Sequence, residues 1–214
     1  MRLVAISDTH GRHDEVEELP KVDILIHAGD FMNAGYHPAE ISSFNRWMGK
    51  QKFAHRIVCA GNHDRFFEGS QFVAREFLTN AIYLENSGVK VAGICMWGSP
   101  YTPEFMKWAF MYRRGGPEAV RYWELIPRNL DVLITHGPPF GILDQSVPGG
   151  EHLGCEELRR AVEEKRPKVH IFGHIHGGAG TMTNGVTRFI NAAYLNERYR
   201  PGAPAGKVHV IDLE

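Results

Sequence analysis

Five short polar motifs in the sequence carry side chains of the kinds that bind metal ions. They are Asp8-Thr9-His10, Gly29-Asp30, Gly61-Asn62-His63-Asp64, Thr135-His136-Gly137 and Gly173-His174-Ile175-His176. Together they offer carboxylate and amide oxygens and imidazole nitrogens without a thiolate, a donor set that suits Mn, Fe or Zn better than Ca or Cu. We therefore predict a metal site with seven ligands: Asp8, His10, Asp30, Asn62, His136, His174 and His176.

The spacing within the motifs supports this prediction. Asp8 and His10 are two residues apart, as are His174 and His176, so each pair points to one side of an extended chain and could hold one ion or two. A single histidine after a strand is more often a core or surface residue than a ligand, but five such motifs together favour a metal site. Three ligand residues are directly preceded by a glycine, namely Gly29, Gly61 or Gly173, where a missing Cβ lets the backbone approach an ion. Alternatively, these glycines simply end strands.

Each motif follows a short apolar run that predicts a buried β-strand. Apolar residues recur at helical spacing between several of these runs, so the sequence predicts βαβ units. Ligands in such sheets bind at the carboxyl ends of the strands, and the five motifs should therefore meet at one edge. The predicted strands cover residues 3–7, 24–28, 56–60, 89–94, 132–136 and 169–173, and the predicted helices cover 38–50, 71–79 and 155–165.

The C-terminal part of the sequence has the pattern of antiparallel strands. Asn184-Gly185 favours a tight turn between predicted strands at 180–183 and 186–190, and residues 207–213 are predicted as a final strand. This gives a mixed architecture, with strands joined by helices early in the chain and by hairpins late. The stretch 97–123 fits no period, and we predict a long loop with a short helix there.

Aromatic residues are concentrated between Trp97 and Tyr112, and Arg113 and Arg114 follow them. Such residues could stack on a nucleobase and neutralise a phosphate. We favour the alternative that they pack in the core or form a dimer contact, because no spacing rule marks a base-binding site. The aromatic residues are Trp97, Tyr101, Phe105, Trp108, Phe110 and Tyr112.

The composition indicates a single domain over residues 1–214. Hydrophobic residues make up 43% of the chain, and no linker, repeat or low-complexity tract divides it. Residues 200–206 are the nearest approach to a flexible segment. A formal net charge of −1 argues against a nucleic-acid partner. Cys59, Cys95 and Cys155 are odd in number and widely spaced, so we expect reduced thiols.

The apolar run at residues 1–6 is too short for a signal peptide or a membrane span. We therefore expect no membrane contact and a cytoplasmic location. The sequence leaves the oligomeric state open.

The remaining histidines fall into two groups. His27 and His170 lie inside predicted strands, so we expect them in the core. We expect five others on the surface or at the rim of a pocket: His13, His37, His55, His152 and His209.

The five motifs resemble those of the calcineurin-like metallophosphoesterase superfamily, whose pattern is Asp-x-His, Gly-Asp, Gly-Asn-His-Asp/Glu, a later His and Gly-His-x-His. All five match, and they span most of the chain, from Asp8 to His176. More narrowly, the chain is similar to the metallophosphoesterase-domain-containing branch, which resembles an animal brain phosphodiesterase. This narrower resemblance is carried by Gly29-Asp30-Phe31, residues 97–110, Thr135-His136-Gly137-Pro138-Pro139 and Thr181-Met182-Thr183.

The resemblance implies an α/β fold (α+β four-layer) in which two facing mixed β-sheets are flanked by helices. It also implies that two metal ions share Asp30. Animal members of the branch can carry Gly at the first His of the last motif, whereas this chain has His174, so both metal sites should fill. The implied ligand sets are Asp8, His10 and His176 for one ion and Asn62, His136 and His174 for the other.

The activity implied by the resemblance is that of a phosphoric ester hydrolase, and most specifically a phosphodiesterase. Two divalent ions, Mn, Fe or Zn with Mn favoured, would activate a bridging hydroxide that attacks phosphorus. The substrate would be a nucleotide-like or other small phosphodiester, with a purine nucleotide as one candidate. The alternatives are a phosphomonoesterase or phosphoprotein phosphatase at the same site, a non-catalytic scaffold of the same fold, and, disfavoured by the near-neutral charge, a nuclease.

His63 is not a ligand in the family pattern. The resemblance implies that it lies over the substrate phosphate, where it stabilises charge or protonates the leaving oxygen. Asp64 comes next in sequence and could orient the His63 imidazole and keep it charged, or it could cap the helix that follows. We predict His63 and Asp64 as the catalytic residues.

Overall fold

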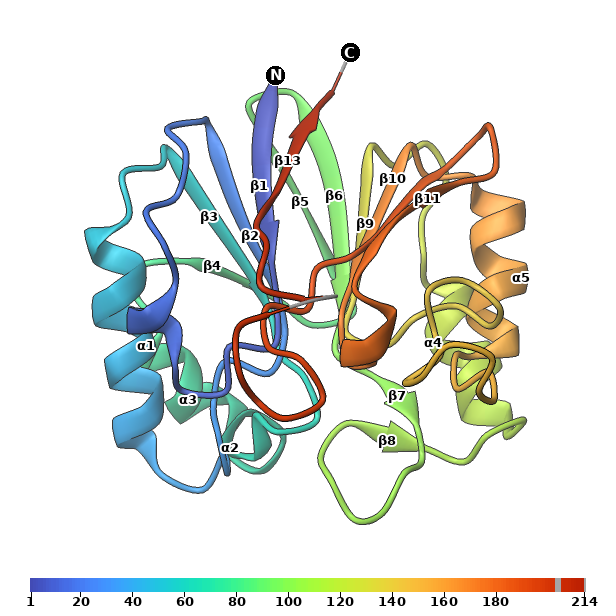
Figure 1. Cartoon of the computed structure of the whole chain (residues 1–214), viewed down its shortest axis with the longest axis horizontal. Coiled ribbons are helices and arrows are strands. Elements are labelled where there is room, and N and C mark those ends of the chain that lie inside the picture. Colours follow the sequence, from blue (N-terminus) through green and yellow to red (C-terminus); the bar gives the residue numbers. More distant parts are fainter. Residues whose placement is uncertain (203–204, 214) are drawn as a thin grey trace.

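The computed structural model describes residues 1–202 and 205–213. Two mixed β-sheets face each other in it, with helices on both outer sides (Figure 1). The first sheet has the order β13-β1-β2-β3-β4 and the second the order β11-β12-β10-β9-β6-β5. The first contains β1 (Arg2–Ile6), β2 (Ile24–Ala28), β3 (His55–Cys59), β4 (Ile82–Leu84) and β13 (His209–Asp212). The second contains β5 (Ser87–Val91), β6 (Ile94–Ser99), β9 (Val132–Thr135), β10 (Val169–Phe172), β11 (Gly180–Thr183) and β12 (Arg188–Asn191).

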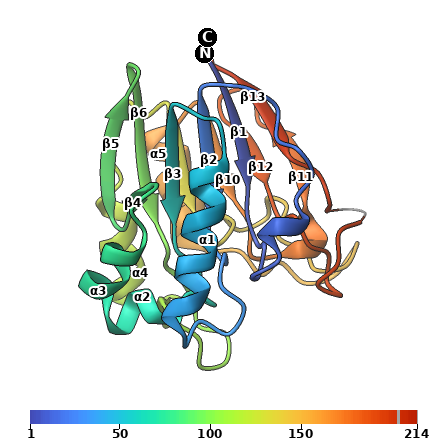
Figure 2. The same cartoon turned by 90° about the vertical axis from the view of Figure 1, so that its left-hand side faces the viewer.

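The helices cover the outer faces of the two sheets. α1 to α3 lie outside the first sheet, and α4 and α5 lie outside the second (Figures 1 and 2). The predicted four-layer α/β fold is therefore confirmed. The helices are α1 (Pro38–Lys50), α2 (Arg65–Gly69), α3 (Gln71–Phe77), α4 (Pro117–Glu124) and α5 (Glu156–Lys165), with short 3-10 turns at η1 (His13–Glu15) and η2 (His176–Gly178).

The alternation of side chains along β1 explains the layers. Leu3 and Ala5 pack into the core between the two sheets, whereas Val4 and Ile6 pack into the core beneath α1. Both faces of each central strand are thus buried, as the continuous apolar runs of the sequence indicated. A third core lies between the second sheet and α4 and α5, around Trp123 and Phe172.

The strand directions bring the polar motifs together. β1 to β4 are mutually parallel, as are β6, β9, β10 and β12, while the antiparallel strands β13, β5 and β11 lie at sheet edges. The carboxyl ends of the parallel strands all lie at the same end of the molecule, which is the lower end in Figure 1. The loops that leave these strands form the candidate site.

Four predictions about individual elements differ from the structure. The single strand predicted at residues 89–94 is a hairpin, because Ala92 and Gly93 adopt positive φ values of 49° and 85° and reverse the chain between β5 and β6. The stretch 97–123 contains the end of β6 and α4, as well as the short strands β7 (Thr102–Pro103) and β8 (Met111–Tyr112). The predicted helix 71–79 ends at Phe77, and the final strand is shorter than predicted, at His209–Asp212.

None of the helices in the described part of the chain is long and apolar enough to cross a bilayer. Residues 203 and 204, within the segment predicted to be flexible, lie outside the described residues.

Candidate metal centre

All seven predicted ligands lie just beyond the carboxyl ends of parallel strands from both sheets. Asp8 and His10 follow β1, Asp30 follows β2 and Asn62 follows β3, so the first sheet supplies four of them. The second sheet supplies His136 after β9, and His174 and His176 after β10. The site is therefore assembled across the two sheets.

The first group of side chains that could hold a metal ion is Asp8, His10 and His176. Asp8 Oδ1 lies 3.4 Å from His176 Nε2, and the Nε2 atoms of His10 and His176 are 3.2 Å apart. All three residues are buried. One carboxylate oxygen and two imidazole nitrogens thus face a common point.

The second group is Asp30, His136 and His174. Asp30 Oδ2 lies 3.3 Å from His136 Nε2, and Asn62 Oδ1 lies 2.9 Å from the same nitrogen. Asp30 Oδ2 is also 3.8 Å from His10 Nε2 in the first group. Since its carboxylate lies between the two groups, Asp30 is placed to serve both.

The hydrogen bonds of the histidines show that a cation fits between these groups. His136 Nδ1 donates to the Ala28 carbonyl oxygen at 3.0 Å, and His176 Nδ1 donates to the Asn196 carbonyl oxygen at 3.1 Å. In the neutral rings, each Nε2 is then a bare acceptor facing carboxylate or amide oxygens. Either a proton or a metal ion must lie between such acceptors, so these residues fit a metal-binding site.

The pKa values of the ligands follow from burial and from the two carboxylates. Burial alone would lower the pKa of His136, but Asp30 outweighs it and raises the value to about 9. Burial is likewise outweighed at His176, where the hydrogen bond to Asp8 raises the pKa to about 9. Burial prevails at His10 and His174 and lowers the pKa of each to about 3. Metal binding should therefore release protons from His136 and His176.

Four of the seven predicted ligands have a backbone conformation that residues other than glycine rarely adopt. The φ values are 54° for Asp8, 42° for His10, 54° for Asp30 and 68° for His174. Positive φ in residues that carry a Cβ costs conformational energy and is concentrated at functional sites. Hydrogen bonds hold these residues in place: His174 N donates to the Asp8 carboxylate at 3.1 Å, and Asp30 N donates to Asp64 Oδ2 at 2.9 Å.

Gly61 and Gly173 are required by close packing around the ligands. A Cβ on Gly61 would lie 2.6 Å from both Asp30 N and His136 Cε1, and a Cβ on Gly173 would overlap the carboxylate of Asp8. Real Cβ atoms essentially never come this close to another heavy atom. The space needed by the ligands thus explains these two glycines better than a general strand-ending preference does.

His63 lies beside both ligand groups. Its backbone N–H donates to Asp30 Oδ1 at 2.7 Å, and its Nδ1 bonds the Asn33 carbonyl oxygen at 2.5 Å. Its ring stacks on Trp108 with a centroid distance of 4.0 Å and an interplanar angle of 21°. The Asn33 bond and the Trp108 stack fix the imidazole, and Nε2 is the nitrogen left for a substrate.

Asp64 has a different environment from either of those predicted. Its carboxylate is buried and accepts backbone N–H groups of Asp30 at 2.9 Å, Met32 at 2.8 Å and Gly61 at 2.7 Å. The backbone carbonyl of Asn33, and not Asp64, orients the His63 ring, and the Asp64 side chain makes no capping hydrogen bond to α2. Its contacts are those of a positioning residue that ties the loops after β2 and β3 together.

A cavity of about 610 Å³ is lined by residues of both ligand groups and by His63. Of the predicted aromatic stretch, Phe105 and Trp108 line this cavity, whereas Trp97, Phe110 and Tyr112 are buried in the core. The preferred core interpretation therefore holds for these three residues and for Tyr101, which is partly buried against the core. The other lining residues come mainly from loops: Pro103, Glu104, Met106, Arg114, Ser146, Leu153, Ile175, Glu197 and Tyr199.

Tyr199 is a cavity residue without a signal in the sequence. Its ring lies 4.8 Å from the ring of His10 and 5.4 Å from that of His176, and its carbonyl oxygen accepts a hydrogen bond from Arg12. It sits in an irregular segment with a positive φ of 55°. Neither its spacing nor its neighbours in the chain form a motif, so only the folded chain reveals it.

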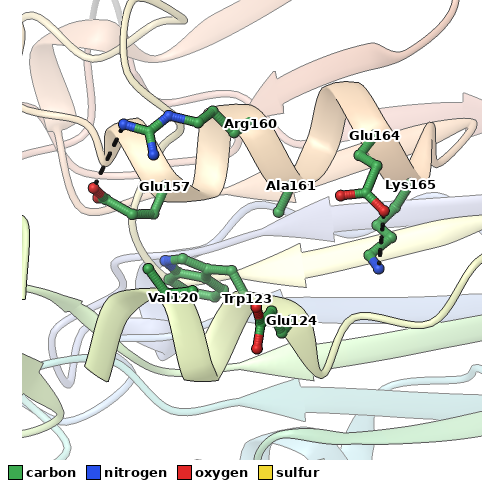
Figure 3. A pocket seen from close by; sticks show the side chains of 8 residues that line it. All are labelled: Val120, Trp123, Glu124, Glu157, Arg160, Ala161, Glu164 and Lys165. Carbon is green, nitrogen blue, oxygen red and sulfur yellow. Dashed lines mark ion pairs between the residues drawn. The ribbon is translucent and has the colours of Figure 1, made fainter. Parts of the chain in front are cut away.

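A smaller hollow of about 170 Å³ lies between α4 and α5, away from the metal ligands (Figure 3). Its charged side chains pair along α5, where Arg160 lies 3.8 Å from Glu157 and Lys165 lies 3.4 Å from Glu164. None of the seven predicted ligands lines it. It therefore belongs to helix packing and is not a candidate site.

The other histidines mostly lie where the sequence indicated. His27 and His170 are fully buried and hydrogen-bond Thr9 and Thr135, which adjoin predicted ligands. The prediction for His13 is wrong, because only 1% of this residue is exposed and its ring packs against Phe44 and Trp47. His37 and His152 are exposed, while His55 and His209 are half-buried.

Comparison with known sequences gives matches over most of the chain. Residues 1–178 match the family model described as Calcineurin-like phosphoesterase. The chain is 39% identical over 237 residues to Metallophosphoesterase domain-containing protein 1 of Homo sapiens, covering 99% of this chain and 71% of that protein. It is 37% identical over 227 residues to the UPF0046 protein T07D4.2 of Caenorhabditis elegans, covering 92% of this chain and 57% of that protein.

Solved structures share the fold at low sequence identity. The protein TT1561 of Thermus thermophilus has a TM-score of 0.65 and 13% identity, covering 99% of this chain and 98% of that one. The phosphopantetheinyl hydrolase PptH from Mycobacterium tuberculosis has a TM-score of 0.56 and 16% identity, covering 94% of this chain and 95% of that one.

Proposed function

Because the chain belongs to the calcineurin-like phosphoesterase family, we propose that it is a hydrolase that uses two divalent metal ions to cleave small phosphodiesters. The observation that carries this proposal is the pair of ligand groups that meet at Asp30 on the wall of one cavity. A purely structural metal site would not need an open cavity large enough for a substrate. The superfamily and branch predicted from the sequence are those of the matching proteins.

We assign the metal ligands according to the two groups. Asp30 would serve both ions, and the oxygen and imidazole donors suit Mn, Fe or Zn, of which we favour Mn. When bound, two such cations would neutralise phosphoryl oxygens and acidify a water molecule. Asp8, His10 and His176 would hold one ion, and Asn62, His136 and His174 would hold the other.

His63 is the residue we assign to proton transfer. Its Nδ1 is engaged by the Asn33 carbonyl, so Nε2 is free to stabilise the phosphoryl charge or to give a proton to the leaving alcohol oxygen. The stack on Trp108 holds the ring in this orientation and shields one of its faces from water. A scaffold without catalysis would not require a histidine fixed in this way beside the ligands.

The walls of the cavity support the proposed preference for diesters over monoesters. A diester places an organic group on each side of phosphorus, and the cavity offers Phe105 and Trp108 as apolar surface near the ligand groups. The size of the cavity also suits a nucleotide, and a purine nucleotide is one candidate substrate. A phosphomonoesterase or phosphoprotein phosphatase is the alternative, and we propose a cytoplasmic substrate in either case.

The test is hydrolysis by the purified protein reconstituted with Mn. We expect release of nitrophenolate from bis(p-nitrophenyl) phosphate, with about two equivalents of Mn per chain by elemental analysis. Asp30→Asn should lose activity and bound metal, while His37→Asn, which alters an exposed histidine, should keep both. Cleavage of p-nitrophenyl phosphate with an intact diester would overturn the diesterase assignment in favour of the monoesterase.

A further inference from the structure

The cavity is poor in positive charge away from the predicted metal ligands. Among the described residues that line it, Arg114 is the one arginine or lysine, while Glu104 and Glu197 contribute carboxylates. The sequence offered Arg113 and Arg114 as residues that could neutralise a phosphate, but Arg113 does not line the cavity. The charge that a substrate meets beyond the metal ligands therefore depends on how Arg114 and the two glutamates are arranged.

The guanidinium of Arg114 is engaged by the protein. Nη1 donates to the Gly154 carbonyl oxygen at 2.7 Å and to Glu156 Oε2 at 2.8 Å, and Nη2 donates to the Leu153 carbonyl oxygen at 2.6 Å. These bonds hold the loop before α5 and neutralise the positive charge with Glu156. These bonds use three of the five guanidinium N–H groups, and Glu156 offsets the positive charge, so Arg114 is a weaker anion receptor than an unpaired arginine would be.

The two glutamates lie on loops that the fold holds in place. Glu197 Oε1 accepts the Gly177 N–H at 2.8 Å, which fixes its carboxylate next to His176 at η2. Glu104 N donates to the Tyr112 carbonyl oxygen at 2.7 Å, so its backbone is anchored beside the β7 and β8 pair. Both loops lie at the lower end of the molecule in Figure 1. Neither glutamate has an ion pair with a lysine or arginine in the described part of the chain.

Apolar side chains form much of the remaining wall. Phe105 and Met106 are 61% and 70% exposed, and neighbouring exposed apolar side chains at the edge of a cavity are a feature of ligand-binding grooves. Tyr199 adds an aromatic ring beside His10, and Trp108 adds an aromatic edge, because its ring is stacked on His63 and lies under the Arg65 guanidinium at 4.4 Å. Aromatic faces next to carboxylates attract flat neutral groups and, more strongly, organic cations.

We infer that this cavity selects phosphodiesters whose second alcohol is either apolar and neutral or an organic cation, and that it rejects those carrying another anionic group. The inference rests on the proposed phosphodiesterase function and narrows its substrate class. Bound metal ions would neutralise the single negative charge of the diester. The carboxylates of Glu104 and Glu197 would repel any further negative charge. Diesters of quaternary ammonium alcohols and of neutral aromatic alcohols belong to the selected class, and nucleoside polyphosphates do not.

Three p-nitrophenyl phosphodiesters test this inference, because they share a leaving group and differ in the second alcohol. The second alcohol is choline in the first ester, phenol in the second and a carboxylate-bearing alkyl alcohol in the third. We expect kcat/KM for the choline and phenyl esters to exceed that for the carboxylate ester by roughly threefold to thirtyfold. This range corresponds to the Coulomb repulsion between two unit negative charges about 8 Å apart, at a dielectric constant between those of protein and water. Added salt should reduce the difference.

Charge removal provides the matched comparison. In the double variant Glu104→Gln and Glu197→Gln, the carboxylate ester should gain activity relative to the choline ester, and most of the discrimination should disappear. Glu151→Gln removes the charge of an exposed glutamate that does not line the cavity, and it should leave the ratio unchanged. Equal kcat/KM values for all three esters in the unmodified protein would overturn the inference, as would a ratio unaffected by the double variant.

Binding separates this inference from the proposed function. If none of the esters is cleaved, the phosphodiesterase proposal fails, but calorimetric titration of the same three esters into the Mn-loaded protein still measures the charge preference. Tighter binding of the choline and phenyl esters than of the carboxylate ester would support the inference. Equal affinities, or tighter binding of the carboxylate ester, would overturn it.

Discussion

The tight packing around Gly61 leads to the sharpest prediction of this structure. In Gly61→Ala, the new Cβ would lie 2.6 Å from Asp30 N and from His136 Cε1, whereas ordinary contacts begin at 3.4 Å. The new Cβ would come closer still to Asp30 Oδ1, so the site must open by at least about 0.8 Å. Asp30 cannot yield easily, because its N–H is bonded to Asp64 and its Oδ1 accepts the His63 N–H.

The cost of this displacement should appear in stability and in metal affinity. Overpacking of a buried site typically lowers the free energy of unfolding by about 1–3 kcal/mol, and we expect the upper half of that range because both neighbours are held by hydrogen bonds. Moving Asp30 and His136 should also weaken metal binding by roughly tenfold to hundredfold, as the loss of supporting contacts commonly does.

Urea unfolding of the metal-free protein and calorimetric titration with Mn measure the two effects. Gly69→Ala is the control, because a Cβ at that position meets nothing within 4 Å. Gly69 lies at the end of α2. The unfolding free energy of the Gly69→Ala variant should therefore differ from that of the unmodified protein by no more than about 1 kcal/mol, and its metal affinity should be unchanged. If Gly61→Ala bound two ions with unaltered affinity and unfolded at the same urea concentration, this description of the centre would be untenable.

The remaining predictions concern four other features of the site and core. His63→Ala should keep its bound metal by elemental analysis but lose turnover by about 10²–10⁴-fold, and undiminished turnover would exclude His63 from proton transfer. Asp64→Ala should lower the free energy of unfolding by about 3 kcal/mol or more in urea, because it leaves three backbone N–H groups without their acceptor. Burial lowers the pKa of His170 to about 3, so below pH 6.5 the unfolded chain binds a proton that the folded chain does not, and stability should fall by about 1.4 kcal/mol per pH unit from this group. His170→Gln should remove that contribution while keeping a donor to Thr135, and an unchanged pH slope would contradict it. Chelation by EDTA should lower the unfolding free energy by about 2.7 kcal/mol for each ion that had been present at a hundredfold excess over its Kd, as measured by urea unfolding; an unchanged midpoint would mean that no metal binds the native state.

The strand ends were predictable from the sequence because two signals coincide there. Each buried strand is a β-branched apolar run, and each ends where a glycine or a polar residue begins a loop, so the predicted strands before Asp8, Asp30 and Asn62 match the structure to within one residue. Parallel pairing then brings those loops to one edge. The seven residues that the motifs single out therefore lie together in the folded chain.

The hairpin at Ala92 and Gly93 shows where such patterns fail. Residues 89–94 are mostly apolar or β-branched and look like one continuous strand, and alanine carries no preference for a positive φ. The two arms are stabilised by their pairing and by neighbours such as β9, which lie far along the chain. Only Gly93 hinted at the turn, and a single glycine inside a strand is an ambiguous signal.

The surroundings of the ligands were less predictable than the ligands themselves. The rings of His63, His136 and His176 are oriented by backbone carbonyls of Asn33, Ala28 and Asn196, and any residue supplies a carbonyl, so no side chain marks these partners. The division of the aromatic stretch is similar, because the course of the chain through β7 and β8 decides which rings are buried and which face the cavity.

The distribution of the ligands along the chain has a consequence for its synthesis. A ribosome must extend the chain through residue 176 before both ligand groups are complete, and the Asn196 carbonyl that fixes His176 emerges later still. A nascent chain that has made only β1 to β4 presents Asp8, His10, Asp30 and Asn62 without their partners. Stable loading with metal is therefore a late event in biogenesis, and it reports that the two halves of the fold have docked.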